Sequence, residues 1–133
     1  MSGAALVRRM LDALNEEGVE AALEFVAEDF RGVVPPELSA EPDSYDGHDG
    51  LRHYFDSFQE IVDDLRFDAE ELVEVAPNVI AARGLITGRG RESGIPIEMR
   101  VPGLYRIRDG KLIGIEAYPS WDDAVAAASS GRG

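Results

Sequence analysis

The sequence contains no cysteine and only two histidines, His48 and His53. Without cysteine, the chain can form neither a disulfide nor a thiolate metal site. The two histidines and the scattered acids show no ligand spacing such as H-x-x-x-H, and no Walker loop, G-x-S-x-G motif or dinucleotide fingerprint is present. We therefore expect neither a catalytic metal nor a cofactor.

Long apolar runs are also lacking. All of them are far shorter than the ~20 residues that a helix needs to cross a bilayer. Arg8 and Arg9 near the N-terminus are not followed by a continuous apolar segment, so we see no secretory signal. The simplest expectation is a cytoplasmic protein that does not contact membranes.

Basic side chains are scarce, because 13 Lys and Arg stand against 26 Asp and Glu, for a net charge of -13. Nucleic-acid phosphates would be repelled by most of this surface, which argues against a nucleic-acid partner. Seven of the basic residues lie within residues 83–111, beside only three acids. This distribution predicts a basic outer face of the sheet. Its arginines either pair with acids of the same chain, or pair with a second subunit in a homodimer, or are solvated. Arg83 either turns inward to hold a carboxylate ligand or joins Arg106 and Arg108 on the outer face.

The clearest pattern of what is present is a long alternation of apolar and charged residues from Ile95 to Tyr118. Before the turn, the apolar positions are odd-numbered: Ile95, Ile97, Met99, Val101, Tyr105 and Ile107. A period of two indicates a half-buried strand, because successive side chains point to opposite faces. Asp109-Gly110 predicts a tight hairpin turn, after which Ile113, Ile115 and Ala117 continue the apolar face.

The length of 133 residues predicts one domain, residues 1–128, with a disordered tail over 129–133. Apolar stripes predict helices over 2–15, 19–27 and 47–65, the last with a wide aromatic stripe, and Ser120 caps a short final helix. We expect strands over 30–34, over 66–75 with a bulge near Glu70-Glu71, and over 79–91, where three glycines indicate bending or close backbone approach. Residues 35–46 read as a loop. This order predicts an α+β fold, with helices on one face of a four-strand antiparallel meander and a small-molecule site at its mouth.

Three segments, F-V-A-E-D-F (25–30), Y-D-G-H-D-G-L-R-H-Y-F (45–55) and G-L-Y-R-I-R-D-G-K-L-I-G-I-E-A-Y (103–118), carry a resemblance in their order and spacing. Over about residues 4–128, the chain resembles the nuclear transport factor 2-like (NTF2-like) superfamily and, within it, the SnoaL-like, polyketide cyclase-like family. The resemblance implies an NTF2-like cone in which three N-terminal helices pack on a strongly curved antiparallel sheet, followed by a short C-terminal helix. Members include isomerases, dehydratases, cyclases, epoxide hydrolases and binding domains, so the fold does not determine the function.

The catalytic residues of these relatives are not matched in this sequence. The position of the ketosteroid isomerase base is Val34, and its phenolic donor falls near Met10 or Leu11. The last-strand acid of limonene epoxide hydrolase falls at Ala117, and the His and Asp of SnoaL-type cyclases fall near Gly103 and Ser120. Either the chemistry differs from these templates, or the protein catalyses nothing.

Candidate site residues must be weighed against ordinary structural roles. We expect a ligand-binding set, which ordinary core packing would also explain: Phe30, Tyr54, Phe58, Met99, Val101, Tyr105 and Ile115. Asp29 would be a general base if burial raised its pKa, and His48 would be a proton donor if nearby acids raised its pKa. Solvated or capping roles are the alternatives for both residues.

Two hypotheses follow for the function. The first is a SnoaL-like protein that binds a small, largely apolar molecule in its cone, with isomerase, cyclase or dehydratase-type proton transfer if it is an enzyme. The second is a non-catalytic NTF2-like module for dimerisation or ligand binding.

Overall fold

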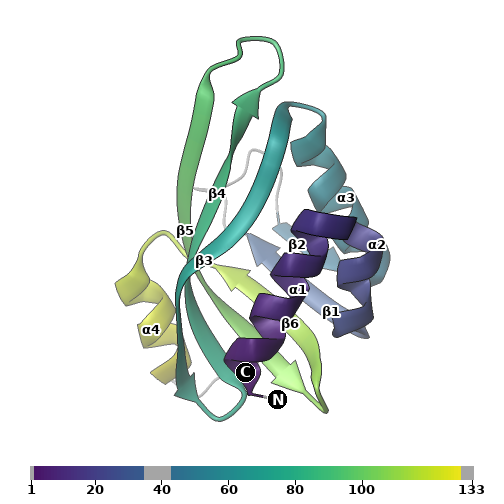
Figure 1. Cartoon of the computed structure of the whole chain (residues 1–133). Coiled ribbons are helices and arrows are strands. Elements are labelled where there is room, and N and C mark those ends of the chain that lie inside the picture. The colour runs from purple at the N-terminus through teal and green to yellow at the C-terminus, as the bar shows by residue number, and fades with distance from the viewer. Residues whose placement is uncertain (1, 35–42, 130–133) are drawn as a thin grey trace.

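A six-stranded sheet wraps around three N-terminal helices in the computed structural model, which describes residues 2–34 and 43–129 (Figure 1). The strands lie in the order β2-β1-β6-β5-β4-β3. The elements along the chain are α1 Gly3–Glu17, α2 Val19–Ala22, the 3-10 helix η1 Leu23–Phe25, β1 Val26–Val34, β2 Asp43–Asp46, α3 Gly47–Gln59, β3 Val62–Ala76, β4 Val79–Gly90, β5 Pro96–Arg108, β6 Lys111–Ala117 and α4 Trp121–Ser129.

The predicted four-strand antiparallel meander is confirmed as β3 to β6. The sheet as a whole is not purely antiparallel, because β1 pairs in parallel with β6 and carries β2 on its other edge. β2 lies inside the predicted loop 35–46, so the loop prediction is wrong for 43–46, while 35–42 lie outside the described residues. A four-residue strand is too short to show a period, which explains why the sequence pattern did not reveal it.

The helical prediction is confirmed for α1 and corrected for α2. Ser2 caps α1 by accepting a hydrogen bond from the Ala5 amide at 3.1 Å, and Gly18 ends the helix with a φ of 106°. The second helix does not reach residue 27, because β1 begins at Val26. Val26 and Phe30 are both buried, and a spacing of four residues fits the periods of helix and strand equally well.

Helix α3 ends at Gln59 rather than at the predicted residue 65. Leu51 and Phe55 are its buried residues, whereas Ile61, which the apolar stripe had placed inside, is 65% exposed. Val62 is buried as the first residue of β3, so the apolar pattern of a helix runs directly into that of a strand. Periodicity alone did not locate the boundary between them.

The β5–β6 hairpin turns at Asp109-Gly110 as predicted, with φ values of 51° and 75°. A register shift in β6 then changes which side chains face the helices, because Ile107 pairs with Leu112 and Arg106 with Gly114. Leu112 is fully buried in the main core, in place of the predicted Ile113. A bulge inserts one residue into one strand, and this reverses the alternation beyond it.

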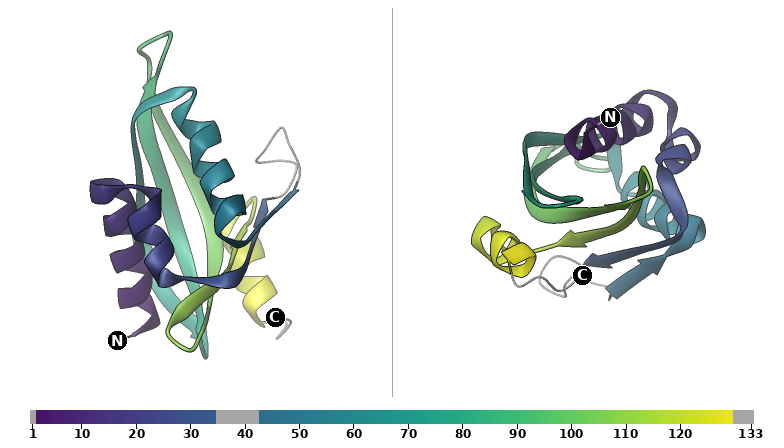
Figure 2. Two further views of the ribbon diagram at one scale, coloured as in Figure 1. Left: turned by 90° about the vertical axis from the view of Figure 1, so that its right-hand side faces the viewer. Right: turned by 90° about the horizontal axis from the view of Figure 1, so that it is seen from below.

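The sheet has a hydrophobic core on each of its two faces. The main core lies between the concave face and the N-terminal helices, and α4 lies on the opposite face (Figure 2). There Ala81 and Leu104 pack against Ala124 and Ala128 of α4. Leu104 is even-numbered, like the charged residues of β5, but α4 covers this end of the convex face and Leu104 is completely buried.

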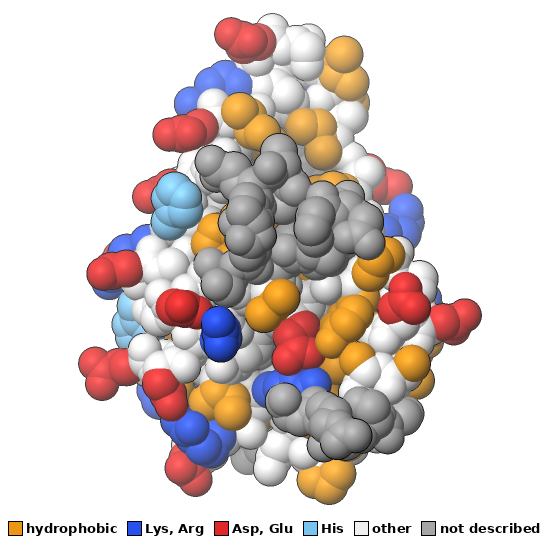
Figure 3. Space-filling model, turned by 180° about the vertical axis from the view of Figure 1, so that it is seen from behind, with side chains coloured by type: hydrophobic (Ala, Val, Ile, Leu, Met, Phe, Trp, Pro, Cys, Tyr) orange, Lys and Arg blue, Asp and Glu red, His pale blue; other side chains and the backbone are white. Residues whose placement is uncertain are grey.

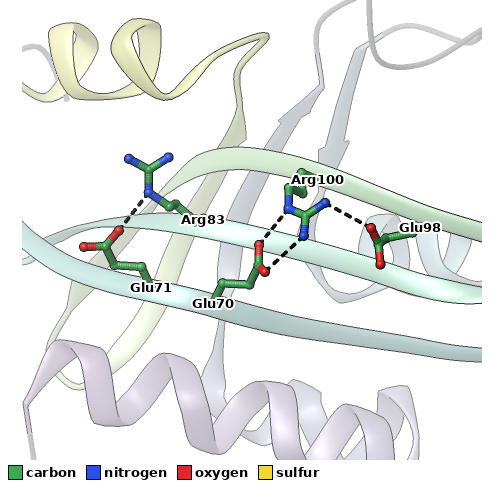
Figure 4. Close-up of polar contacts among 5 residues, drawn as sticks. All are labelled: Glu70, Glu71, Arg83, Glu98 and Arg100. Atoms are coloured by element: carbon green, nitrogen blue, oxygen red, sulfur yellow. Dashed lines mark hydrogen bonds and ion pairs between the residues drawn. The ribbon is translucent and has the colours of Figure 1, made fainter.

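The arginines of the convex face are paired within the chain (Figure 4). Arg83 contacts Glu71 at 2.7 Å, and Arg100 contacts Glu70 at 3.1 Å and Glu98 at 3.0 Å. The basic excess of residues 83–111 is therefore offset by acids from β3, as the alternative of internal pairing predicted. Acidic, basic and apolar side chains are likewise interspersed on the face shown in Figure 3.

Arg83, the bulge in β3 and the C-terminal residues were also subjects of prediction. The Arg83 guanidinium lies 4.0 Å from the Trp121 ring centroid, which places Arg83 outside the cone rather than inside it. The predicted bulge near Glu70-Glu71 is confirmed by a register shift between Ala69 and Glu71. Ser129, predicted as the start of a disordered tail, ends α4, and residues 130–133 lie outside the described part. Within the described part, no helix has the length and apolar character of a membrane span.

Candidate functional site

A cavity lies inside the cone, between the concave face of the sheet and helices α1 and α3. Its volume is about 100 Å³. One water needs about 10–15 Å³ of such space, so there is room for several waters or a small organic molecule. The lining residues are Met10, Leu11, Leu14, Phe30, Gly32, Val33, Tyr45, Leu51, Tyr54, Phe55, Phe67, Asp68, Gly84, Leu85, Ile86, Val101, Gly103, Tyr105, Ile115, Glu116 and Ala117.

Five of the seven predicted ligand-binding residues line this cavity, namely Phe30, Tyr54, Val101, Tyr105 and Ile115. Phe58 and Met99 are not among the described lining residues. The Phe58 ring packs edge-on against Tyr54 at 5.2 Å, so it supports the wall from behind. The structure thus gives the positions of these side chains, while ligand binding by them stays a prediction.

The sequence interpretation did not include several wall residues. Tyr45 lies in the segment that had been read as a loop, and its ring contacts that of Tyr54 at 4.9 Å. Phe67, which belongs to β3, contacts Phe55, with the two ring centroids 5.0 Å apart. The alternation of Phe67 and Ala69 was the available signal for Phe67, whereas nothing local indicated Tyr45. Edge-to-face contacts of this kind hold the aromatic wall in one arrangement.

Close backbone approach shapes the floor of the cavity. A Cβ added to Gly84 would lie 2.7 Å from the Val101 carbonyl oxygen, and one added to Gly103 would lie 2.7 Å from the Glu116 carbonyl oxygen. Both glycines line the cavity. The prediction that glycines in β4 mark close backbone approach is therefore confirmed at Gly84.

Three tyrosines line the cavity, Tyr45, Tyr54 and Tyr105, and the hydroxyl of each has no hydrogen-bond partner among the described residues. No fully buried side-chain oxygen or nitrogen in the described ranges lacks a partner, so each of these oxygens keeps some accessible surface. Burial raises the pKa of Tyr105 to about 12. Burial also raises the pKa of Tyr54, and neighbouring Tyr105 and Tyr45 add to the shift. Both phenols are thus protonated, and therefore hydrogen-bond donors, across the physiological range.

The predicted catalytic residues lie away from this cavity. Asp29 is in β1, not at a helix end, and its exposed carboxylate accepts two hydrogen bonds from Arg108 at 2.8 and 2.9 Å. The hydrogen bond from Arg108 lowers the pKa of Asp29 and outweighs the opposing effect of desolvation, so burial does not raise this pKa as the prediction required. Such a carboxylate is a weak general base near neutral pH.

His48 also lies outside the lining, with its Nε2 2.9 Å from the Val26 carbonyl oxygen. Its two acidic neighbours in sequence are engaged elsewhere, since Asp49 contacts Arg52 at 2.7 Å and Asp46 contacts Arg31 at 3.4 Å. The structure therefore does not bring Asp29 and His48 together with the tyrosines. A catalytic role for either residue stays a prediction without geometric support.

One residue of the cavity lining, Glu116, has its carboxylate held in a network. Glu116 accepts hydrogen bonds from Arg106 Nε at 2.8 Å and from the Tyr118 hydroxyl at 2.7 Å. Burial opposes ionisation of Glu116, but the hydrogen bonds from Arg106 and Tyr118 outweigh it and lower the pKa of Glu116. Among residues 2–34 and 43–129, no group of three or more His, Asp or Glu side chains is arranged to hold a metal ion.

Comparison with known families agrees with this architecture. A sequence model described as a SnoaL-like domain matches residues 7–115. The chain belongs to the SnoaL-like family. The resemblance that the three sequence segments suggested is therefore confirmed. A search of curated proteins gives no match for this SnoaL-like chain.

Solved structures share the fold of this SnoaL-like protein at low identity. An NTF2-like protein of unknown function from Burkholderia pseudomallei is 17% identical, with a TM-score of 0.75 over 95% of this chain and 97% of that chain. IdmH of Streptomyces antibioticus, a candidate polyketide cyclase, is 18% identical, with a TM-score of 0.75 over 98% and 99%. TerC, co-crystallised with polyporic acid, is 14% identical, with a TM-score of 0.76 over 93% and 98%. At these identities, the likeness establishes the NTF2-like fold alone.

Proposed function

We propose that this SnoaL-like protein binds a small, largely apolar molecule inside its cone. The observation that carries the proposal is the cavity itself, which is walled by aromatic and aliphatic side chains and lies between the sheet and helices α1 and α3. An apolar hollow with a few polar groups is the usual form of a small-molecule site. The co-crystallisation of TerC with polyporic acid supports the idea that the fold accommodates small organic molecules.

The proposal concerns binding, and catalysis would require a titratable group that reaches the ligand. Cofactor-independent proton transfer by Asp29 and His48 is not supported by their positions outside the cavity lining. Isomerase, cyclase or dehydratase activity is therefore the weaker form of the proposal. A non-catalytic ligand-binding module fits the described residues at least as well.

Homodimerisation through the convex sheet face is a separate proposal. This face carries the ion pairs of Arg100 with Glu70 and Glu98, and Val73 is 36% exposed. Interspersed charges of both signs suit a self-complementary interface between two copies. Light scattering at micromolar protein should give about twice the chain mass, and a mass near 14.5 kDa would contradict the proposal.

Indane, an apolar bicyclic molecule, is a suitable probe for the cavity. We expect saturation-transfer NMR to show saturable binding of indane to the wild-type protein. Val101→Phe fills part of the cavity and should weaken this binding at least ~10-fold, because the volume that indane needs is occupied. Val73→Phe makes the same change on the convex face and should leave binding unaltered. Absence of saturable binding, or equal loss in both variants, would refute the proposed function.

A further inference from the structure

We infer that the cavity selects neutral molecules that carry a hydrogen-bond acceptor and rejects organic anions. This inference deepens the proposed function and rests on it. It concerns which small apolar molecules are accepted, and it follows from the polar groups that face the cavity and from the charges that are missing there.

Two acids occur among the lining residues, but their carboxylates are directed away from the cavity. Asp68 lies between Phe67 and Ala69, which both pack into the main core, so the alternation of a strand directs its side chain to the opposite face. Its carboxylate accepts a hydrogen bond from Arg66 at 2.9 Å. Asp68 therefore contributes backbone to the cavity wall rather than a free carboxylate.

Glu116 follows the same rule in β6. Its neighbour Ile115 packs against the main core, and the Glu116 carboxylate is bound by Arg106 and by the Tyr118 hydroxyl. Both acids are thus already paired on the convex side. Neither of them can bind a cationic group inside the cavity without breaking an existing ion pair.

The polar side chains left to face the cavity are tyrosines. The hydroxyls of Tyr45, Tyr54 and Tyr105 have no partner in the described part of the chain, and the Tyr45 ring packs beside that of Tyr54. A hydroxyl in an apolar cavity gains most from a ligand atom that accepts a hydrogen bond from it. A carbonyl, ether or hydroxyl oxygen on an apolar frame provides such an acceptor.

No positive side chain balances a negative ligand. The described lining residues include no Lys, Arg or His. Transfer of an ionised carboxylate into an apolar site is strongly unfavourable unless the charge is paired there. The phenol donors provide hydrogen bonds but no opposite charge. A ketone should therefore bind, whereas a carboxylate of the same frame should be excluded.

Three matched probes test the inference: indane, 1-indanone and indane-1-carboxylate. They share one bicyclic frame and differ in the acceptor and in the charge. We expect 1-indanone to bind about 3- to 10-fold more tightly than indane, which corresponds to one net hydrogen bond, and the carboxylate to bind at least ~30-fold more weakly than the ketone. Affinities come from saturation-transfer titrations at constant ionic strength.

Tyrosine variants identify the donors. Tyr45→Phe, Tyr54→Phe and Tyr105→Phe each remove one hydroxyl with almost no change of shape, and at least one of them should abolish the preference for 1-indanone while indane affinity stays the same. Tyr118→Phe is the matched control, because its hydroxyl is bound to Glu116 rather than directed at the cavity. Thermal unfolding confirms that each variant is folded.

The outcomes separate the two proposals. If indane binds as tightly as 1-indanone, or if the carboxylate binds at least as well as the ketone, the selectivity inference fails while the proposed function stands. If none of the three probes binds, the proposed function fails, and the inference fails with it. A ketone preference that survives in Tyr45→Phe, Tyr54→Phe and Tyr105→Phe alike would also overturn the inference.

Discussion

Asn15, at the end of helix α1, ties this helix to the edge of the sheet and provides a direct test of how the cavity wall is held. Its side-chain amide donates to the Phe67 carbonyl oxygen at 2.7 Å and accepts from the Phe67 amide at 2.9 Å. β3 is an edge strand, so the Asn15 amide takes the place of a neighbouring strand at this residue. The change that we consider is Asn15→Ala.

The expected loss is about 2 kcal/mol of unfolding free energy. Each of the two hydrogen bonds contributes a net of about 1 kcal/mol, and the partly buried backbone groups of Phe67 lose their partner as well. The higher helix propensity of alanine returns about 0.5 kcal/mol. For a chain of this length, a net loss of about 2 kcal/mol lowers the melting temperature by roughly 5–8 °C.

Urea unfolding followed by circular dichroism measures the global effect, and amide hydrogen exchange measures the local one. The Phe67 amide should exchange faster in Asn15→Ala, because its acceptor has been removed. Glu16→Ala is the control, since Glu16 is exposed on the same helix and its replacement should change stability by less than about 0.5 kcal/mol.

The reasoning would be refuted if Asn15→Ala matched Glu16→Ala in stability and left Phe67 exchange unchanged. α1 would then be held by apolar packing alone. Because α1 supplies Met10, Leu11 and Leu14 to the cavity wall, the expected loosening should also weaken indane binding in Asn15→Ala.

Three further predictions concern Glu116, Leu104 and the pair Asp29 and His48. The depressed pKa of Glu116 means that its stabilising contribution is present above its ordinary pKa of 4.5 and is lost as the pH falls through the lower folded value. Glu116→Gln should therefore be less stable than wild type by about 1–3 kcal/mol near neutral pH, and this difference should shrink in acid. Urea midpoints measured across pH test this, and a difference that does not change with pH would contradict it. Leu104→Ala leaves a void under α4 and should reduce unfolding free energy by about 2–5 kcal/mol without changing indane affinity, as calorimetry and NMR titration can test. Asp29→Asn and His48→Asn should leave indane affinity unchanged, and a large loss in either titration would show that these residues reach the ligand after all.

The fold could be predicted to the extent that its signals are local. The Asp109-Gly110 turn, the alternation before it and the apolar stripe of α1 each involve residues close in sequence, and all three are confirmed. The end of α3 could not be located in the same way, because Ile61 and Val62 extend an apolar pattern that belongs to two different elements. Local periodicity does not distinguish a residue at the end of a helix from the first residue of a strand.

The candidate site was predictable only in part for a related reason. Phe30, Tyr54 and Tyr105 were found because aromatic residues on the apolar side of an element tend to face the core. Tyr45 was missed because its position depends on β2 pairing with β1, which is a contact that no local pattern encodes. Asp29 was suggested as a base, but its carboxylate is bound by Arg108, which lies far along the chain.

The sequence by itself therefore determined the α+β class, the family, the central hairpin and the apolar character of the cone, because these depend on periods and turns within short segments. The tertiary structure alone decided the parallel pairing of β1 with β6, the burial of Leu104 under α4 and the bulge that exchanges Leu112 for Ile113. It also decided which hydroxyls are left without a partner in the cavity. Burial and hydrogen-bond satisfaction are set by neighbours that are distant in sequence, so they exist only once the sheet has closed around the helices.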